Sequence, residues 1–131
     1  MKIVADTNTF LAVALDEPEK ARLIEATDGN ELVAPAVLPY EIANALSSLA
    51  RRKIITGRQL AAAWDATAAV PVELATVNVR AALLLAGHFG IYAYDAYFLQ
   101  CAQDTKCPLL TLDRGLKRVA QELSIELVEL S

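Results

Sequence analysis

The sequence predicts an α/β protein in which a parallel central sheet is covered by helices. Short apolar runs with strand character alternate with longer runs of helical periodicity along the chain. The strand-like runs are apolar on both faces, which is typical of parallel strands that helices cover on both sides. The helical runs outnumber the strand-like runs, and two of them follow each other between residues 38 and 70. We expect a helical insertion there.

The first half of the chain is predicted to contain two strands and four helices. The strands are short apolar runs that end at Asp6 and at Pro35. The helices begin at residues favoured in first turns or caps, namely Pro18, Pro39 and Thr56. In order, we expect a strand at 2–5, helices at 9–15 and 18–27, a strand at 32–34, and helices at 39–53 and 56–68.

The second half is predicted to continue the alternation. Pro71 and Pro108 open apolar runs that we interpret as strands, and Gly87 is expected to end a helix. In order, we expect a strand at 71–74, helices at 77–86 and 94–105, a strand at 108–112, a helix at 115–123 and a strand at 125–130.

Size and composition narrow the class of protein. The 131 residues match one domain, since domains have roughly 100–200 residues, so we expect a single domain over residues 1–131. The hydrophobic fraction of 55% argues against disorder, and the net charge of −4 against a broadly basic nucleic-acid-binding surface. Two isolated cysteines and the lack of a leader or a long apolar run predict a cytoplasmic protein without a membrane span.

Four acidic residues stand where ligands bind in parallel α/β sheets, beyond the carboxyl ends of the strands. Asp6 and Asp113 directly follow two predicted strands, and Glu41 and Asp95 fall in the first turns of predicted helices. Each position also has a purely structural explanation. Aspartate is a favoured helix cap, and an acidic side chain in a first turn complements the helix dipole.

The surroundings of Glu41 and Asp95 favour a metal site. Their neighbours are mainly apolar, and no Lys or Arg lies within one helical turn of either residue. Carboxylates without a partner near a buried face are costly, and a divalent cation would compensate them. A set of four carboxylates without His or Cys selects Mg²⁺ or Mn²⁺ rather than zinc.

Four short motifs together resemble those of PIN-domain ribonucleases, and the small chain is similar to VapC-type toxins of prokaryotic toxin–antitoxin pairs. The resemblance covers essentially the whole chain, with a small departure at Thr9-Phe10 that removes no carboxylate. The motifs are Asp6-Thr7-Asn8, Pro-Tyr-Glu-Ile-Ala-Asn-Ala-Leu around Glu41, Tyr94-Asp95-Ala96-Tyr97, and Thr111-Leu112-Asp113.

The resemblance implies a Rossmann-like three-layer fold and a metal-dependent endoribonuclease that cleaves RNA with metal-activated water. It implies that Asp6 and Asp95 bind the metal directly and that Glu41 and Asp113 are further ligands or hold water. The implied catalytic and metal-binding residues are Asp6, Glu41, Asp95 and Asp113, supported by Asn8 and Thr111. The implied partners are an RNA substrate, a cognate antitoxin protein and a second copy of the chain.

Two other functions share part of this sequence pattern. A PIN-like binding module without catalysis would be expected to lack some of the acids, and all four are present. A haloacid-dehalogenase-like phosphatase also has an aspartate after its first strand, but needs D-x-D where this chain has Asp6-Thr7-Asn8. The basic residues 51–53 either complement the end of a helix or contact RNA phosphates or an acidic partner segment.

Overall fold

The computed structural model describes all 131 residues and contains one sheet of four parallel strands. The strand order is β3-β2-β1-β4, with β1 paired to β2 and to β4, and β2 paired to β3. The strands are β1 (Lys2–Ala5), β2 (Glu31–Pro35), β3 (Val72–Ala75) and β4 (Leu109–Leu110). The predicted parallel α/β architecture is therefore confirmed.

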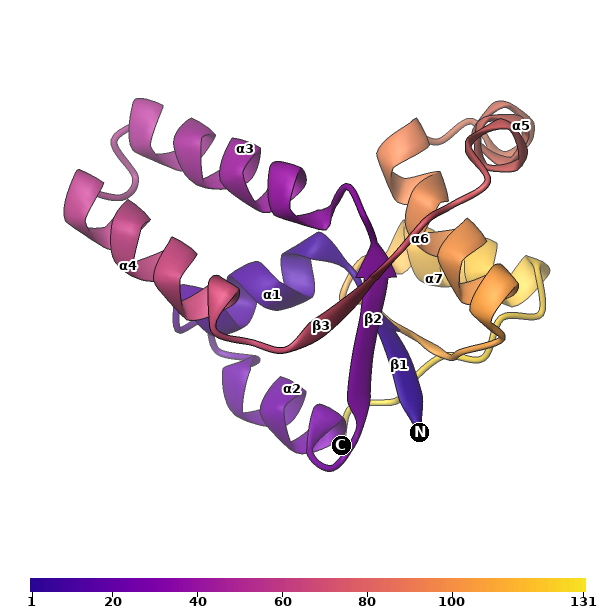
Figure 1. Cartoon of the computed structure of the whole chain (residues 1–131), viewed down its shortest axis with the longest axis horizontal. Helices are drawn as coiled ribbons and strands as arrows, with labels where there is room; N and C mark the ends of the chain where they lie inside the picture. The colour runs from indigo at the N-terminus through magenta and orange to yellow at the C-terminus, as the bar shows by residue number, and fades with distance from the viewer.

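Seven helices flank the sheet. Figure 1 shows α1 to α4 on one side of the strands and α5 and α6 on the other. The pair α3 and α4 lies between β2 and β3 in the chain, where a helical insertion was expected. The helices are α1 (Thr7–Ala14), α2 (Lys20–Thr27), α3 (Leu38–Arg51), α4 (Gly57–Ala68), α5 (Val79–Phe89), α6 (Ala93–Thr105) and α7 (Arg114–Glu122).

The core lies where β1 and β4 meet α6. Val4 of β1, Leu109 of β4 and Leu99 of α6 have no exposed surface. Cys101 is also in this core, and burial raises the pKa of its thiol to about 12. This thiol is protonated at neutral pH, so it serves packing rather than chemistry. None of the helices is both long and apolar enough to cross a membrane.

Side-chain caps fix the starts of four helices, and the cap of α5 is Asn78, which accepts the backbone N–H of Ala81. Asp6 accepts the backbone N–H of Thr9 and caps α1, and Asp113 accepts that of Leu116 and caps α7. Thr56 caps α4 as predicted, in a reciprocal capping box with Gln59. Asp6 directly follows β1, whereas Asp113 does not directly follow β4 as predicted, because β4 already ends at Leu110. The caps still hold both carboxylates beyond the carboxyl ends of these strands, at the same edge of the sheet.

Several predicted boundaries are wrong. The first helix begins at Thr7 rather than residue 9, because Asp6 caps it. Pro18 lies in a turn, and α2 begins at Lys20. Helix α5 continues through Gly87 and ends at Gly90, whose φ of +67° is in the left-handed region that glycine tolerates.

The C-terminal segment also differs from the prediction. Residues 125–130 form no strand, and only Leu127 makes a single parallel bridge, to Leu109. The predicted strand at 108–112 is reduced to Leu109 and Leu110. A two-residue edge strand offers too few backbone groups to extend the ladder.

Candidate acidic site

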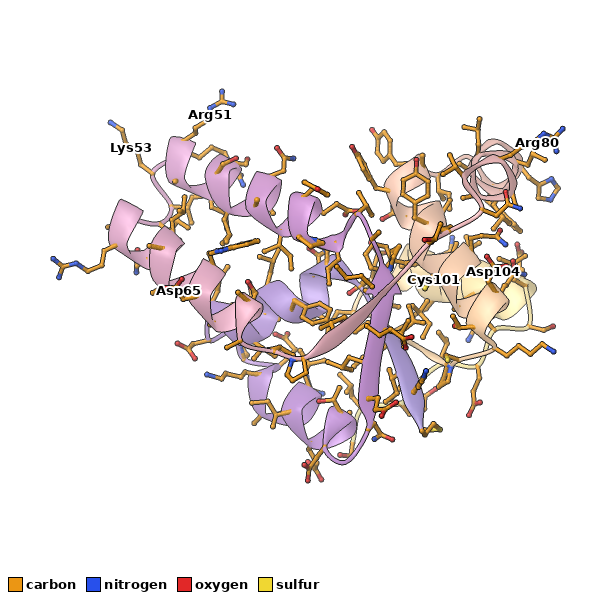
Figure 2. The ribbon with its side chains drawn as sticks, in the orientation of Figure 1. Arg51, Lys53, Asp65, Arg80, Cys101 and Asp104 are labelled. Atoms are coloured by element: carbon orange, nitrogen blue, oxygen red, sulfur yellow. The ribbon has the colours of Figure 1, made fainter.

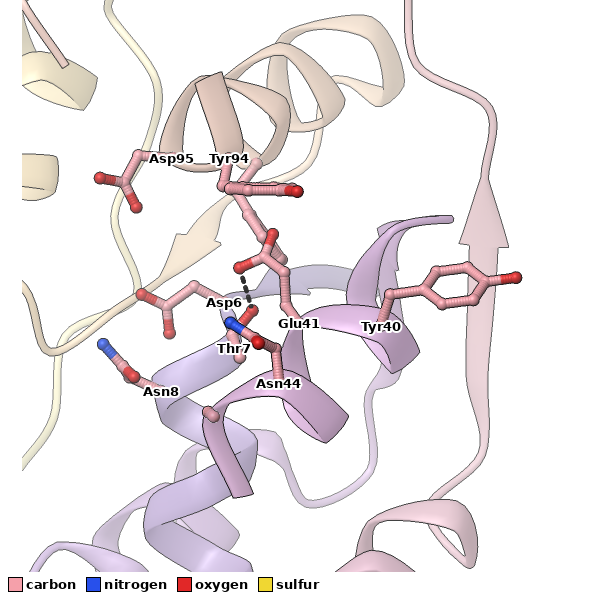
Figure 3. Close-up of a pocket in the computed structure, with 10 residues that line it drawn as sticks. Asp6, Thr7, Asn8, Tyr40, Glu41, Asn44, Tyr94 and Asp95 are labelled. Atoms are coloured by element: carbon pink, nitrogen blue, oxygen red, sulfur yellow. Dashed lines mark hydrogen bonds between the residues drawn. The ribbon is translucent and has the colours of Figure 1, made fainter. Parts of the chain in front are cut away.

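Three of the four predicted acids line one cavity. Asp6 at the end of β1, Glu41 in the first turn of α3 and Asp95 in the first turn of α6 border a volume of about 260 Å³ (Figure 3). Asn8, predicted as a supporting residue, lines the same cavity from α1. The end of β1 and the first turns of α3 and α6, which are far apart in the sequence, therefore meet at this point.

Asp113 lies beside this cavity. It lines an adjoining groove of about 610 Å³, which shares Asn8 and Asn44 with the acidic cavity. One oxygen of Asp113 accepts the Leu116 N–H at 2.9 Å. A Cβ on Gly115 would lie only 3.2 Å from that oxygen, so glycine leaves room for the carboxylate.

Thr111 lies behind the cavity and does not line it. Its buried hydroxyl donates to Oδ2 of Asp6 and accepts the backbone N–H of Asp113 at 3.1 Å. Thr111, predicted as a supporting residue, thus links Asp6 to Asp113 by hydrogen bonds. It acts on the cavity only through the carboxylate of Asp6.

Asp6 is a buried carboxylate held by several donors, and only 5% of its surface is exposed. Its Oδ1 accepts the N–H of Thr9 at 3.0 Å and the Thr9 hydroxyl at 2.7 Å. Burial raises the pKa of Asp6, the hydrogen bonds from Thr111 and Thr9 oppose this rise, and the charge of Asp113 adds to it. The donors thus stabilise the ionised form that burial disfavours.

Glu41 and Asp95 have raised pKa values for similar reasons. Burial is the largest cause for Glu41, opposed by the Thr7 hydroxyl, which donates to Oε2 at 3.0 Å, and reinforced by Asp95 and Asp6. For Asp95 burial again comes first, followed by the charges of Asp113 and Asp6. The acids are therefore close enough to repel one another, although burial contributes more than repulsion.

No cationic side chain pairs with these acids. The two ion pairs of the chain, Lys2–Glu73 and Lys20–Asp16, involve none of them. Oε1 of Glu41 is buried and has no hydrogen-bond partner. A buried acceptor without a partner is costly, and a bound cation would supply the missing partner. The other carboxylates of the cavity add negative charge that would attract the same cation.

The donor set fits a hard, largely hydrated cation. The side chains do not bring three or more acidic, His or Cys groups together as a ready-made metal cage. Mg²⁺ typically binds one or two carboxylates directly and keeps several water molecules, so it does not need such a cage. No His or Cys lines the cavity, which disfavours zinc.

The structure adds polar and aromatic residues that the sequence prediction left without a role. Asn44 lies three residues after Glu41 and hence on the same face of α3, a spacing that would have identified it. The hydroxyl of Thr7 donates to Glu41, and Tyr40 and Tyr94 also line the cavity. These three stand inside the motifs, directly beside the acids.

The fold and the acidic site together define a class: a parallel α/β protein with carboxylates from strand ends and from first helical turns clustered at one edge of the sheet. The family model of the PIN domain matches residues 3–122, and the chain belongs to this family. This membership sets aside the phosphatase alternative.

Individual relatives agree with the assignment. The chain is 30% identical over 121 residues to Ribonuclease VapC3 of Pyrobaculum aerophilum, covering 88% of this chain and 92% of that protein. The crystal structure of PAE2754 from Pyrobaculum aerophilum matches with a TM-score of 0.64 at 22% identity, covering 91% and 87%. VapBC2 from Rickettsia felis, bound to a promoter DNA fragment, matches with a TM-score of 0.68 at 15% identity, over 100% of both chains. The two structural matches support the fold.

Proposed function

We propose that the chain is an endoribonuclease that hydrolyses RNA phosphodiester bonds with the help of Mg²⁺ or Mn²⁺. The observation that carries the proposal is the convergence of Asp6, Glu41 and Asp95 on one cavity without a cationic partner. Family membership and the likeness to Ribonuclease VapC3 support the choice of RNA as substrate.

The four acids would share the work of holding the cation. We assign Asp6 and Asp95 as direct ligands, and Glu41 and Asp113 as further ligands or as holders of water. When bound, the cation supplies a nucleophilic water at neutral pH and compensates the charge that develops on the phosphate. Because the acids repel an anionic substrate, a bound cation would also make it easier for RNA to approach the pocket.

The neighbouring hydroxyls prepare the carboxylates for this task. Thr111 and Thr9 donate to Asp6, which fixes its orientation and favours its ionised form. Thr7 donates to one oxygen of Glu41 and leaves the other without a partner. The amide of Asn8, on the cavity wall, is placed to orient a water or a phosphate oxygen.

A cleavage assay tests the proposal. The purified protein should cleave single-stranded RNA in millimolar Mg²⁺ and should stop when EDTA is added. Asp65→Asn, which removes an exposed acid of α4 outside the cavity, should keep full activity. RNA that is bound and never cleaved would instead favour the non-catalytic PIN-like module.

We also propose that the chain forms a homodimer through α5. Val79, Leu83 and Leu84 on this helix are 59%, 60% and 58% exposed, and exposed apolar side chains that gather on one element mark interaction sites. Sedimentation equilibrium should show a dimer at micromolar concentration, and Leu83→Glu should dissociate it. The control variant Ile54→Glu, at a similarly exposed apolar residue in the α3–α4 connection, should leave the dimer intact. A wild type that sediments as a monomer would contradict the proposal.

Finally, we propose that the chain acts as a toxin and is held by an antitoxin. Two apolar cavities of about 190 and 230 Å³ flank α4 and share Phe10 and Val70. Trp64, which is 38% exposed, lines the second. An apolar helical tail of the antitoxin fits this surface, and a cationic side chain from it would pair with the acids.

Two observations test the antitoxin proposal. A small upstream reading frame with a basic DNA-binding N-terminus and an apolar helical tail would identify the partner. If that partner inhibits equally well after its basic residues near the acidic cavity are neutralised, the charge-pairing part of the proposal is wrong.

A further inference from the structure

We propose that the substrate is held as a single strand, with one base stacked on Tyr94 and a phosphate bound by Arg52 on the far side of the acidic cavity. This inference rests on the proposed ribonuclease function, because it places the RNA across the same site. It assigns two binding residues outside the acidic quartet, from the walls of the cavity and of the adjoining groove.

Tyr94 provides an exposed aromatic surface at the edge of the acidic cavity. It precedes Asp95 in the first turn of α6, lines the cavity and is 56% exposed. Its ring packs nearly perpendicular to that of Tyr97, with the ring centres 5.9 Å apart, and its exposure leaves ring surface open to a base. Tyr40, 76% exposed, lines the same cavity from α3, but its ring points away from the acids (Figure 3), so Tyr94 is the aromatic platform beside them.

Arg52 stands at the other end of a continuous path. The groove that adjoins the acidic cavity runs along α3 past Asn44, Ser48 and Arg52, which are spaced four residues apart and share a face of the helix. With a rise of 1.5 Å per residue, Arg52 lies about 16 Å along the helix axis from Glu41. An RNA strand whose scissile phosphate lies at the acids must therefore extend over neighbouring nucleotides before one of its phosphates reaches Arg52.

The groove distinguishes among the three consecutive basic residues. Arg52 lines it, whereas Arg51 and Lys53 do not, and both extend from the tip of the α3–α4 pair (Figure 2). Arg52 has no ion-pair partner. Glu17 and Asp113 also line the groove and disfavour a phosphate beside them, which places the phosphate contact at the Arg52 end.

Stacking on Tyr94 requires a base that is free of a duplex. Bases in double-stranded RNA already stack on their neighbours, whereas proteins that bind single strands combine aromatic platforms with cationic contacts to the backbone. Tyr94 and Arg52 supply these two elements on either side of the acids. We therefore expect single strands to be preferred.

Binding can be measured apart from cleavage. The probe is a short, unstructured, fluorescein-labelled RNA, and its anisotropy is measured in millimolar Mg²⁺ with Asp6→Asn as the parent protein, which prevents cleavage and lowers the negative charge. Tyr94→Ala should weaken binding about tenfold, since stacking contributes about that much per base. Tyr92→Ala, which removes a more exposed tyrosine outside the cavity, should have no effect.

The dependence on salt separates the two contacts. Arg52→Ala should weaken binding and lower the slope of log K against log salt by about 0.7, the contribution of one phosphate contact to a single strand. Tyr94→Ala should leave that slope unchanged, and Tyr94→Phe should bind like the parent. Arg51→Ala is the matched control for Arg52→Ala and should leave both affinity and slope unchanged.

The outcomes distinguish this inference from the proposed function. The RNA path would be overturned if no binding is detected, or if duplex and single-stranded RNA bind with equal affinity. It would also be overturned if the control variants lose as much affinity as the test variants. Arg52→Ala that weakens only antitoxin binding would assign the groove to an acidic segment of that partner. RNA that binds as expected to a wild type without cleavage would retain the path and refute the nuclease proposal.

Discussion

Replacement of Thr111 by valine should destabilise the protein through Asp6. Valine has nearly the shape of threonine but cannot donate to Oδ2 of Asp6 or accept the N–H of Asp113. A hydrogen bond to a charged group contributes about 1.5–3 kcal/mol. With an unfolding entropy of about 2.1 cal/mol/K per residue, the 131 residues give about 0.28 kcal/mol/K, and the melting temperature should fall by about 5–11 °C.

The loss should also depend on pH in a defined direction. The Thr111 hydroxyl opposes the rise in the pKa of Asp6, so its removal raises that pKa further. A carboxyl whose folded pKa exceeds its unfolded pKa destabilises the protein as pH rises between the two values. The gap between wild type and Thr111→Val should therefore be widest at neutral pH and should narrow as pH falls below the folded pKa of Asp6.

Thermal melts and urea titrations over a series of pH values measure both effects. Thr111→Ser keeps the hydroxyl and should retain the pH dependence of the wild type, with only the loss of a buried methyl group. If Thr111→Val melts like Thr111→Ser at every pH, the hydroxyl does not stabilise the Asp6 carboxylate and the reasoning is refuted.

Three further predictions concern the acids themselves. Asp6→Asn or Asp95→Asn should abolish RNA cleavage with unchanged circular dichroism, because an amide cannot replace the charge on a ligand of a hard cation; more than a few per cent of residual cleavage would remove that residue from the site. Asp113→Asn should keep the wild-type melting temperature because Asn caps as well as Asp, while Asp113→Ala should cost about 1 kcal/mol; both should lose cleavage. Mg²⁺ at a hundredfold excess over its dissociation constant should stabilise the wild type by about 2.7 kcal/mol, or about 10 °C, and Asp6→Asn much less. A wild-type melt that Mg²⁺ leaves unmoved would contradict the metal site.

The fold was predictable where strong local signals agreed. The first strand and the cap at Thr56 combine favoured residue types with abrupt changes of hydrophobicity, and the structure confirms them. The end of α5 was not predictable, because Gly87 and Gly90 both follow an apolar helical run and only the tertiary path selects Gly90. Residues 125–130 have an apolar strand pattern, but strand formation also needs a partner, and β4 is too short.

The site was predictable in its charges but not in its hydrogen bonds. Strand ends and first turns located the four acids, since these are positions that a local pattern can indicate. The hydroxyls that hold them come from distant parts of the chain. Thr7 reaches Glu41 across 34 residues and Thr111 reaches Asp6 across 105 residues. No local pattern encodes such pairs, because they depend on the order of the strands in the sheet.

Helix capping and metal chemistry, which compete as explanations for Asp6 and Asp113 in the sequence, are compatible in the structure. A carboxylate has two oxygens and about four acceptor sites, whereas a cap uses one oxygen. Asp113 caps α7 with Oδ1 alone, which leaves Oδ2 for a ligand. Asp6 uses Oδ1 for the cap and for the Thr9 hydroxyl, and its Oδ2 accepts only Thr111. The N-terminus of α1 and these donors offset part of the cost of burying this charge. The cap is thus what holds the carboxylate in place at the strand end, and the remaining lone pairs are what a cation would bind.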